Sequence, residues 1–405
     1  MKFCPECGVK LMSQKFCHEC GCNIATYLGG GESVSTSTST NSFSGGFGGG
    51  FDSFDFSALQ NAASEQLSAQ NEKKKFYDNA EVSGTALVKY KGKGENVVIP
   101  EGITEIRNSA FYSADVRSIR VPASVTKIEE IGLYCCKAES FEVDIENKYF
   151  KSIDGVVYSK DGRTLVQFPN GRSGFYNMPN EVENVKRSSI SGCTKLTGLT
   201  ISNRLTRIDD FMFCGTAFST LDIPSSVTSI GMNAFEMCGS LSSITIPGNV
   251  SIIGENAFSC CTSLRSVTIN EGVVSMGSCA FFNCTSLSSI TLPNSLNVIG
   301  ARAFQQCSSL SSITIPRGVT TVRSGAFAYC SSLSSVTIEE GVRTIEAEAF
   351  NNQCLKSVKI PTSVQSISNS AFPTSFGFYG GGFKMYVPRG RRYGLDTYGR
   401  EFIDY

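Results

Sequence analysis

Two cysteine pairs near the amino terminus carry the most specific chemical pattern in the 405-residue sequence. Cys4 and Cys7 form a Cys-x-x-Cys-Gly motif, and Cys17 and Cys20 repeat it thirteen positions later. Two such turns facing each other can place four thiolates in a tetrahedron around one zinc ion. We therefore predict a structural Zn²⁺ site with these four cysteines as ligands. Because protein atoms fill all four positions, the site is not expected to be catalytic.

Two nearby residues offer alternative ligands for this site. Cys22 could replace Cys20, but the repeat places Cys20 opposite Cys7. His18 occupies the position that Pro5 holds in the first motif, which is typical of a loop residue rather than of a ligand. A redox dithiol would need only one cysteine pair, and no thioredoxin-like βαβ pattern follows it. We therefore favour zinc.

The predicted zinc domain, residues 1–28, is too short to fold on apolar burial alone. Metal binding would supply its folding free energy, which is on the order of 10 kcal/mol in comparable peptides. This segment resembles the short zinc-ribbon family, with Cys-Pro-x-Cys-Gly at residues 4–8 and a second motif at residues 17–21. The resemblance implies binding either to nucleic acid or to protein.

A linker and a helix are predicted between this ribbon and the rest of the chain. Residues 29–56 are rich in Gly, Ser, Thr and Phe without helical or strand periodicity, which is typical of a flexible, disordered tether. Residues 57–80 place Leu59 and Leu67 on one helical face, and Ser57 can cap the helix.

The remaining sequence repeats one short unit at a strict period. Leu241, Ile244 and Ile246 of one unit should point inward and Ser243 and Thr245 outward, because side chains alternate along a strand. Stacked units would bury continuous rows of Ile, Phe and Cys, which predicts a solenoid. The period is marked by Ala-Phe pairs that begin at Ala234, Ala257, Ala280, Ala303, Ala326 and Ala349.

The period is interrupted between Pro122 and Pro179, whose separation exceeds two repeat units. Two alternating runs, Ser152–Tyr158 and Thr164–Phe168, are joined by a Lys-Asp-Gly turn at residues 160–162. This pattern predicts a β-hairpin insertion at about residues 144–178 that projects from the solenoid.

The repeat resembles the BspA-like leucine-rich repeat family in its Ile-Pro, Val-x-x-Ile-Gly, Ala-Phe-x-x-Cys and Ser-Leu-x-x-Ile motifs, over about residues 82–405. The resemblance implies a mainly β, right-handed leucine-rich-repeat solenoid with a role in binding, and many members are exported surface proteins. We predict the solenoid at residues 81–388, with the hairpin inserted, and a carboxy-terminal cap or tail at residues 389–405.

Catalysis is not expected from the residues available. The single histidine, His18, lies inside the second cysteine motif, so no Ser-His-Asp or Cys-His arrangement can form in the solenoid. No phosphate-binding glycine loop is present, and nothing in the sequence brings two carboxylates together in a cleft. We predict that the protein is not an enzyme.

The repeat contains one cysteine in most turns. Stacked turns would bring these cysteines within disulfide reach, but free thiols packed beside the Phe row are predicted instead. The residues concerned are Cys214, Cys238, Cys261, Cys284, Cys307 and Cys330.

The outward strand positions form two rows of Ser and Thr with few charged or aromatic residues. Stronger anchors for a partner are expected at the insertion and at the tail. In the insertion these are Tyr149, Phe150, Phe168, Phe175 and Tyr176, and in the tail they are Arg389, Arg391, Arg392, Tyr393 and Tyr398.

We interpret the protein as a non-enzymatic adaptor in which the ribbon and the solenoid bind different proteins. A zinc-ribbon protein that associates with nucleic acid is one alternative, although 36 basic and 36 acidic residues give no net field to favour it. An exported surface adhesin is another. Because no apolar export signal or membrane-spanning stretch is seen, we expect a cytoplasmic protein without membrane contact.

Overall fold

The computed structural model describes residues 56–135, 137–373, 383–395 and 400–405. The described part contains one α-helix followed by short β-strands, as the predicted fold class requires. The ribbon predicted at residues 1–28 and most of the linker predicted at residues 29–56 lie outside the described residues.

Helix α2, Phe56–Asp78, precedes the first strand and is attached through its last turn. Residues 61–75 are exposed, whereas Phe76 is buried and its ring stacks on Tyr90 at a centroid distance of 5.3 Å. Tyr90 in turn contacts Phe111, the first ring of the solenoid core, at 5.4 Å. Among the described residues, no helix combines the length and apolarity that a membrane span requires.

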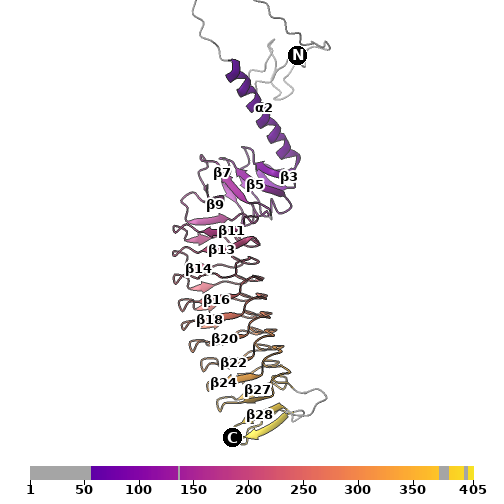
Figure 1. Cartoon of the computed structure of the whole chain (residues 1–405), viewed down its shortest axis with the longest axis vertical. Helices are drawn as coiled ribbons and strands as arrows, with labels where there is room; N and C mark the ends of the chain where they lie inside the picture. The colour runs from indigo at the N-terminus through magenta and orange to yellow at the C-terminus, as the bar shows by residue number, and fades with distance from the viewer. Residues whose placement is uncertain (1–55, 136, 374–382, 396–399) are drawn as a thin grey trace, which may run out of the picture. The chain divides into compact units, whose positions relative to one another are not determined.

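The strands are stacked coil upon coil in chain order and form two series of parallel pairs (Figure 1). The longer strands carry the outward Ser and Thr residues, and we call their outer surface the strand face. Its members are β3 Lys93–Val98, β5 Asp115–Val121, β7 Ser140–Val143, β11 Gly174–Asn177, β13 Leu196–Thr200, β16 Ser243–Ile246, β18 Ser266–Ile269, β20 Ser289–Thr291, β22 Ser312–Ile315, β24 Ser335–Ile338, β26 Ser357–Lys359, β28 Phe383–Val387 and β29 Arg400–Asp404.

The second series consists of very short strands that pair in parallel from coil to coil. Its first members, β4 Glu105–Ile106 and β6 Lys127–Ile128, extend a hairpin of β1 Ala80–Ser83 and β2 Ala86–Tyr90. Eight later strands make one continuous sheet: β14 Arg207–Ile208, β15 Ser229–Ile230, β17 Ile252–Ile253, β19 Ser275–Met276, β21 Val298–Ile299, β23 Thr321–Val322, β25 Thr344–Ile345 and β27 Ser366–Ile367.

A row of phenylalanine rings forms the centre of the core. From Phe235 to Phe372, the ring centroids of neighbouring coils lie 4.9–5.4 Å apart, with interplanar angles of 12° or less. This spacing is close to the separation of paired strands, so a ring that recurs every coil stacks on its neighbour. The strict period of the sequence is thus the condition for a continuous aromatic stack.

Five cysteines run beside this row and form the cysteine ladder. In each, Sγ donates to the carbonyl oxygen of the Phe in the preceding coil at 3.1 Å, and all five side chains are fully buried. The predicted free thiols are therefore present at Cys238, Cys261, Cys284, Cys307 and Cys330.

The prediction that Cys214 is a sixth member of the ladder is wrong. It is only half-buried, and Thr216 occupies the ladder position of that coil, with its hydroxyl 2.8 Å from the Phe213 carbonyl oxygen. The coil between Phe213 and Phe235 is shorter by a single position than the coils from Phe235 to Phe350 that follow it. Cys214 lies outside the row because it directly follows Phe213, whereas each ladder cysteine comes three positions after a Phe of the row.

A glycine stands at the close contact between coils after several of the short strands. A Cβ atom built on Gly277 would lie 2.5 Å from the backbone nitrogen of Glu255, and one on Gly300 would lie still closer to the Gly277 carbonyl carbon. Gly231 and Gly254 show the same crowding. The Ile-Gly motif of the repeat therefore reflects a contact that leaves no space for a side chain.

The insertion is built differently from the prediction. The run Ser152–Tyr158 is interrupted by a turn at Asp154-Gly155, where both residues have positive φ, so three strands result: β8 Phe150–Ile153, β9 Val156–Ser159 and β10 Thr164–Gln167. They form an antiparallel meander, and β10 pairs in parallel with β12 Asn184–Val185.

The predicted projection of this hairpin from the solenoid is also wrong. Val156 and Tyr158 belong to the core that continues to the carboxy terminus, whereas Val157 and Val166 belong to the core that starts at Phe76. Alternate side chains of β9 thus enter different cores, because successive residues of a strand face opposite sides. The meander is a layer between two cores, and both of its faces are buried.

The segment predicted as a cap or tail continues the stack. β29 lies within residues 389–405 and pairs in parallel with β28 along its whole length. Arg391 donates to the Val364 carbonyl oxygen at 2.8 Å, and Arg392 forms an ion pair with Asp404 at 2.7 Å. These contacts hold the last turn against the coils before it.

We expect Gly277→Ala to lower the free energy of unfolding by about 3 kcal/mol, because the new methyl group would collide with backbone of the adjacent coil. Urea unfolding followed by circular dichroism measures the change. Gly239→Ala is the control, since its Cβ would meet only the Thr262 hydroxyl at 3.9 Å. Equal unfolding midpoints for the two variants would contradict the contact.

We expect the cysteine ladder to resist alkylation in the folded protein. Burial raises the pKa of Cys284 and of Cys330 to about 12, so both remain protonated thiols at mildly alkaline pH. Cys354 is exposed and should be labelled by iodoacetamide within minutes, whereas Cys284 should react only after unfolding. Peptide mass spectrometry measures both, and labelling of Cys284 at the rate of Cys354 would refute the buried ladder.

Candidate functional site

The predicted zinc ligands Cys4, Cys7, Cys17 and Cys20 lie outside the described residues, as do Cys22 and His18. Within the described part of the chain, no group of three or more His, Cys, Asp or Glu side chains could hold a metal ion. The zinc site therefore stays a prediction from the sequence.

The buried titratable groups of the solenoid have structural environments. The hydroxyl oxygens of Tyr158 and Tyr176 lie 2.6 Å apart, and burial raises the pKa of each, which keeps the pair protonated. Lys186 donates to the Ile128 carbonyl oxygen at 3.0 Å, and burial lowers its pKa. These groups do not converge on a cleft where a substrate could bind.

Several carboxylates fasten one coil to the next. Glu271 accepts the backbone N–H groups of Asn294 and Ser295 at 2.9 and 3.0 Å, and these hydrogen bonds lower its pKa. Glu340 makes the same pair of bonds to Thr362 and Ser363, and its pKa is also lowered. Each of the two carboxylates thus acts as an anion that satisfies backbone donors. Neither forms part of an acid–base pair.

The strand face carries the two predicted rows of small hydroxyl side chains. The register aligns Ser243 with Ser266 and Thr245 with Thr268, and the same pairing continues through β20 and from β22 to β24. All of these residues except Ser243, which is half-buried, are exposed. The face thus presents uncharged, small hydroxyl groups from β16 to β24, in two separately paired sets of strands, β16–β18–β20 and β22–β24.

The predicted anchors in the insertion divide into two groups. Tyr149 and Phe175 are exposed, at 53% and 59% of their surface. Phe150, Phe168 and Tyr176 are buried in the cores and are wrong as surface anchors. Their aromatic type alone could not distinguish a core position from a surface position in a meander that is covered on both sides.

The predicted anchors in the tail are partly used within the chain. Arg391 and Arg392 are exposed but make the contacts that hold the last turn, and Tyr393 packs against the core. Arg389 is exposed, and Tyr398 lies outside the described residues.

A break in the strand face produces a cleft that sequence analysis missed. β13 pairs with β11 on one side, but among the described residues no strand pairing joins it to residues 219–224 of the next coil. That segment is instead bonded to the following coil. The Ser219 carbonyl oxygen accepts from the Ser242 N–H at 2.8 Å, and Asp222 and Thr245 form an isolated parallel β-bridge. We attribute the separation to the shorter coil after Phe213.

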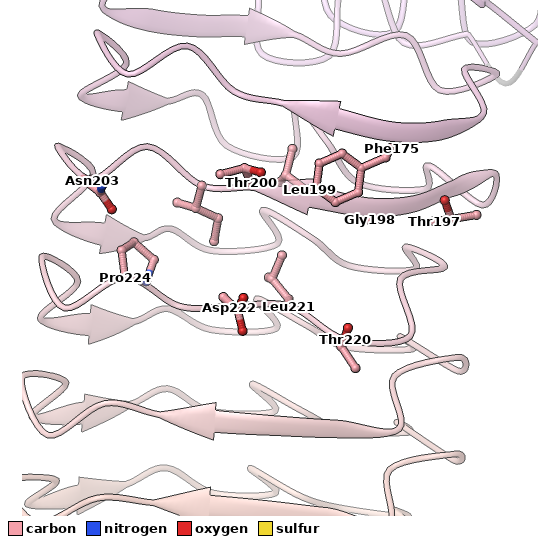
Figure 2. A pocket seen from close by; sticks show the side chains of 11 residues that line it. Phe175, Thr197, Gly198, Leu199, Thr200, Asn203, Thr220, Leu221, Asp222 and Pro224 are labelled. Carbon is pink, nitrogen blue, oxygen red and sulfur yellow. The ribbon is translucent and has the colours of Figure 1, made fainter.

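The cleft has a volume of about 370 Å³ and opens on the strand face (Figure 2). Leu199, Ile201 and Leu221, all nearly buried, provide its apolar lining. Its remaining lining residues are Phe175, Thr197, Gly198, Thr200, Asn203, Thr220, Asp222 and Pro224. In the sequence, the cleft coincides with the shortened interval between Phe213 and Phe235.

Comparison with known proteins identifies the repeat. The sequence matches the family described as BspA type leucine-rich repeat region, in six copies, over residues 86–173, 167–281 and 251–377. These ranges together cover more than half of the chain. A search of curated proteins found no match.

A search of solved structures found other leucine-rich repeat proteins. A leucine-rich repeat protein from Eubacterium ventriosum is 31% identical, with a TM-score of 0.57 over 61% of this chain and 67% of that one. A leucine-rich cell surface protein from Faecalibacterium prausnitzii is 23% identical, with a TM-score of 0.43 over 73% and 98%. A leucine-rich repeat protein from Bacteroides ovatus is 21% identical, with a TM-score of 0.40 over 80% and 97%.

The family match covers the same residues as the structural repeat. These residues form the Ala-Phe and Cys rows and the paired short strands. The chain therefore belongs to the BspA-type leucine-rich repeat family.

Proposed function

We propose that the protein is a non-enzymatic adaptor whose strand face binds one protein partner and whose amino-terminal zinc ribbon binds another. The observation that carries the proposal is the largely exposed double row of Ser and Thr from β16 to β24. Solenoids of stacked repeats typically use such extended surfaces for binding other proteins. A linker between two binding modules would raise the effective concentration of one partner near the other.

A protein partner suits this surface better than a nucleic acid does. The rows from Ser243 to Thr337 contain no lysine or arginine, and phosphate recognition depends on such groups. Glu271 and Glu340 bond backbone donors of the next coil, which gives these two carboxylates a structural role. These features favour binding over both nucleic-acid association and catalysis.

The proposed zinc ion has a structural role in this scheme. Four thiolates would fill its coordination sphere, so the metal would stabilise the ribbon without touching a substrate. A cytoplasmic location is part of the proposal and is supported by the eleven free cysteines of the described residues, which suit a reducing compartment. Fractionation of the source cells, with detection by antibody, tests the location against an exported surface protein.

The strand face can be tested by placing bulky charges on it. We expect the triple variant Thr268→Arg, Thr291→Arg, Thr314→Arg to lose at least about tenfold in binding to a captured protein partner, because three guanidinium groups would have to be desolvated at the contact. The three residues are exposed, so the fold should be unaffected. Capture from source cells identifies the partner, and titration calorimetry with the purified partner measures the affinity.

The matched control is the triple variant Thr206→Arg, Thr262→Arg, Thr320→Arg, which adds the same number of charges at exposed sites outside the two rows. This control should bind the partner like the unaltered protein. Equal loss in both variants, or no loss in either, would rule out the strand face as the binding surface.

The zinc ribbon is tested by metal content. We expect one zinc ion per chain, and we expect Cys4→Ser combined with Cys7→Ser to remove it while the unfolding midpoint of the solenoid stays unchanged. The exposed Cys354 provides the control, since Cys354→Ser should retain the metal. Plasma emission spectrometry gives the stoichiometry. A zinc content unaffected by the double replacement would exclude these ligands.

A further inference from the structure

We propose that the cleft between β13 and residues 220–224 binds a neutral pyranose, such as one residue of a glycan. This inference is independent of the proposed adaptor function, because it concerns a different part of the strand face and a small polyhydroxyl ligand. The volume of about 370 Å³ lies at the lower end of the range for small-molecule sites and suits one or two sugar rings.

The first feature is an aromatic platform at the rim. Phe175 occupies the outward row that Ser residues fill in later coils, and its register partner on β13 is Gly198. A Cβ atom on Gly198 would lie 2.6 Å from the Phe175 ring, so the absence of a side chain lets the ring rest on β13. The ring is nevertheless 59% exposed.

An exposed ring of this kind is suited to the C–H face of a sugar. The face of an aromatic ring carries partial negative charge, and the axial C–H bonds of a pyranose carry partial positive charge. Figure 2 shows the Phe175 ring next to Leu199 and Gly198 of β13, with Thr200 further along the same strand. A sugar resting on the ring would present its hydroxyl groups to the polar side chains of the two coils.

The second feature is a set of mixed donors and acceptors around that platform. Asp222 projects from the facing coil at the position where later coils carry Thr, and its carboxylate can accept from two adjacent hydroxyl groups. Thr220 and Asn203 contribute a hydroxyl and an amide that both donate and accept, whereas the Thr200 hydroxyl donates to Asn177 Oδ1 at 2.9 Å and is left to accept. Asp222, Thr200, Thr220 and Asn203 are all exposed, so they are available to a ligand.

The charge of the cleft selects among ligand classes. Asp222 is the only ionisable side chain in the lining, so a phosphate, a sulfate or a uronic acid would meet a like charge without a compensating cation. A basic peptide would use the carboxylate but would leave the Thr and Asn groups without matched partners. A neutral sugar can use the ring, the carboxylate and the hydroxyl groups together.

Binding can be measured on the intact, purified chain with defined probes. The probes are methyl β-glucoside, methyl β-galactoside, methyl α-mannoside, N-acetylglucosamine, cellobiose, lactose and chitobiose, with glucuronic acid and a trilysine peptide as comparisons. Saturation-transfer NMR should show at least one neutral sugar bound with a millimolar dissociation constant, as expected for a ligand of about a dozen non-hydrogen atoms. Glucuronic acid should bind at least about tenfold more weakly than that sugar.

Three variants locate the site. Phe175→Ala and Asp222→Asn should each weaken binding of the sugar by about tenfold or more, and Asp222→Asn should also reduce the discrimination against glucuronic acid. Asp222→Asn preserves the shape of the side chain, so it stays informative if Phe175→Ala disturbs the fold. Thr291→Ala, in the same outward row on β20, is the control and should bind normally.

The outcomes separate this site from the adaptor surface. Absence of binding by all the neutral sugars, binding of trilysine alone, or sugar binding that both Phe175→Ala and Asp222→Asn leave unchanged would overturn the proposal. None of these results bears on the protein partner, because the arginine variants of β18, β20 and β22 do not alter the cleft lining.

Discussion

The separation between successive coils is the constraint on which the remaining structure depends. Parallel backbone hydrogen bonds hold neighbouring strands about 4.8 Å apart, and the Phe ring centroids follow at 4.9–5.4 Å. At that separation each residue lies against its own equivalent in the next coil. Rings stack, the thiol of Cys284 reaches the carbonyl of Phe258, and Gly277 is required where backbone meets backbone. Repetition in the sequence is thus a consequence of contact between like residues.

The same constraint explains why distinct surface features occur where the period is broken. Where the coils keep the full period, from β16 to β24, the strand face repeats small hydroxyl groups. The shorter coil after Phe213 loses its pairing with β13, and the cleft beside Asp222 results. The meander β8–β10 interrupts the stack and separates two cores, so it stabilises both while exposing little of itself. Distinct surface chemistry arises at these irregular coils.

A stack of this kind also needs its ends covered, since each open end would present an apolar core and unpaired strand edges. At the first coil, Phe76 of helix α2 stacks on Tyr90, which in turn contacts Phe111. At the last, β29 adds a strand that carries the exposed Glu401 and Asp404, and charged edge strands resist pairing with other chains. The Arg392–Asp404 pair holds that turn in place.

The sequence by itself determined the class of fold, the inward and outward residues of the repeat and the buried thiols, because a strict period forces equivalent residues into equivalent environments. It did not determine the role of the insertion, since alternating apolar residues at Val156 and Val157 fit a projecting hairpin as well as a layer between two cores. Nor did it show the cleft, which we attribute to the coil between Phe213 and Phe235 that is shorter by a single position. Those features were decided by tertiary structure, because they arise from contacts between coils that no single repeat contains.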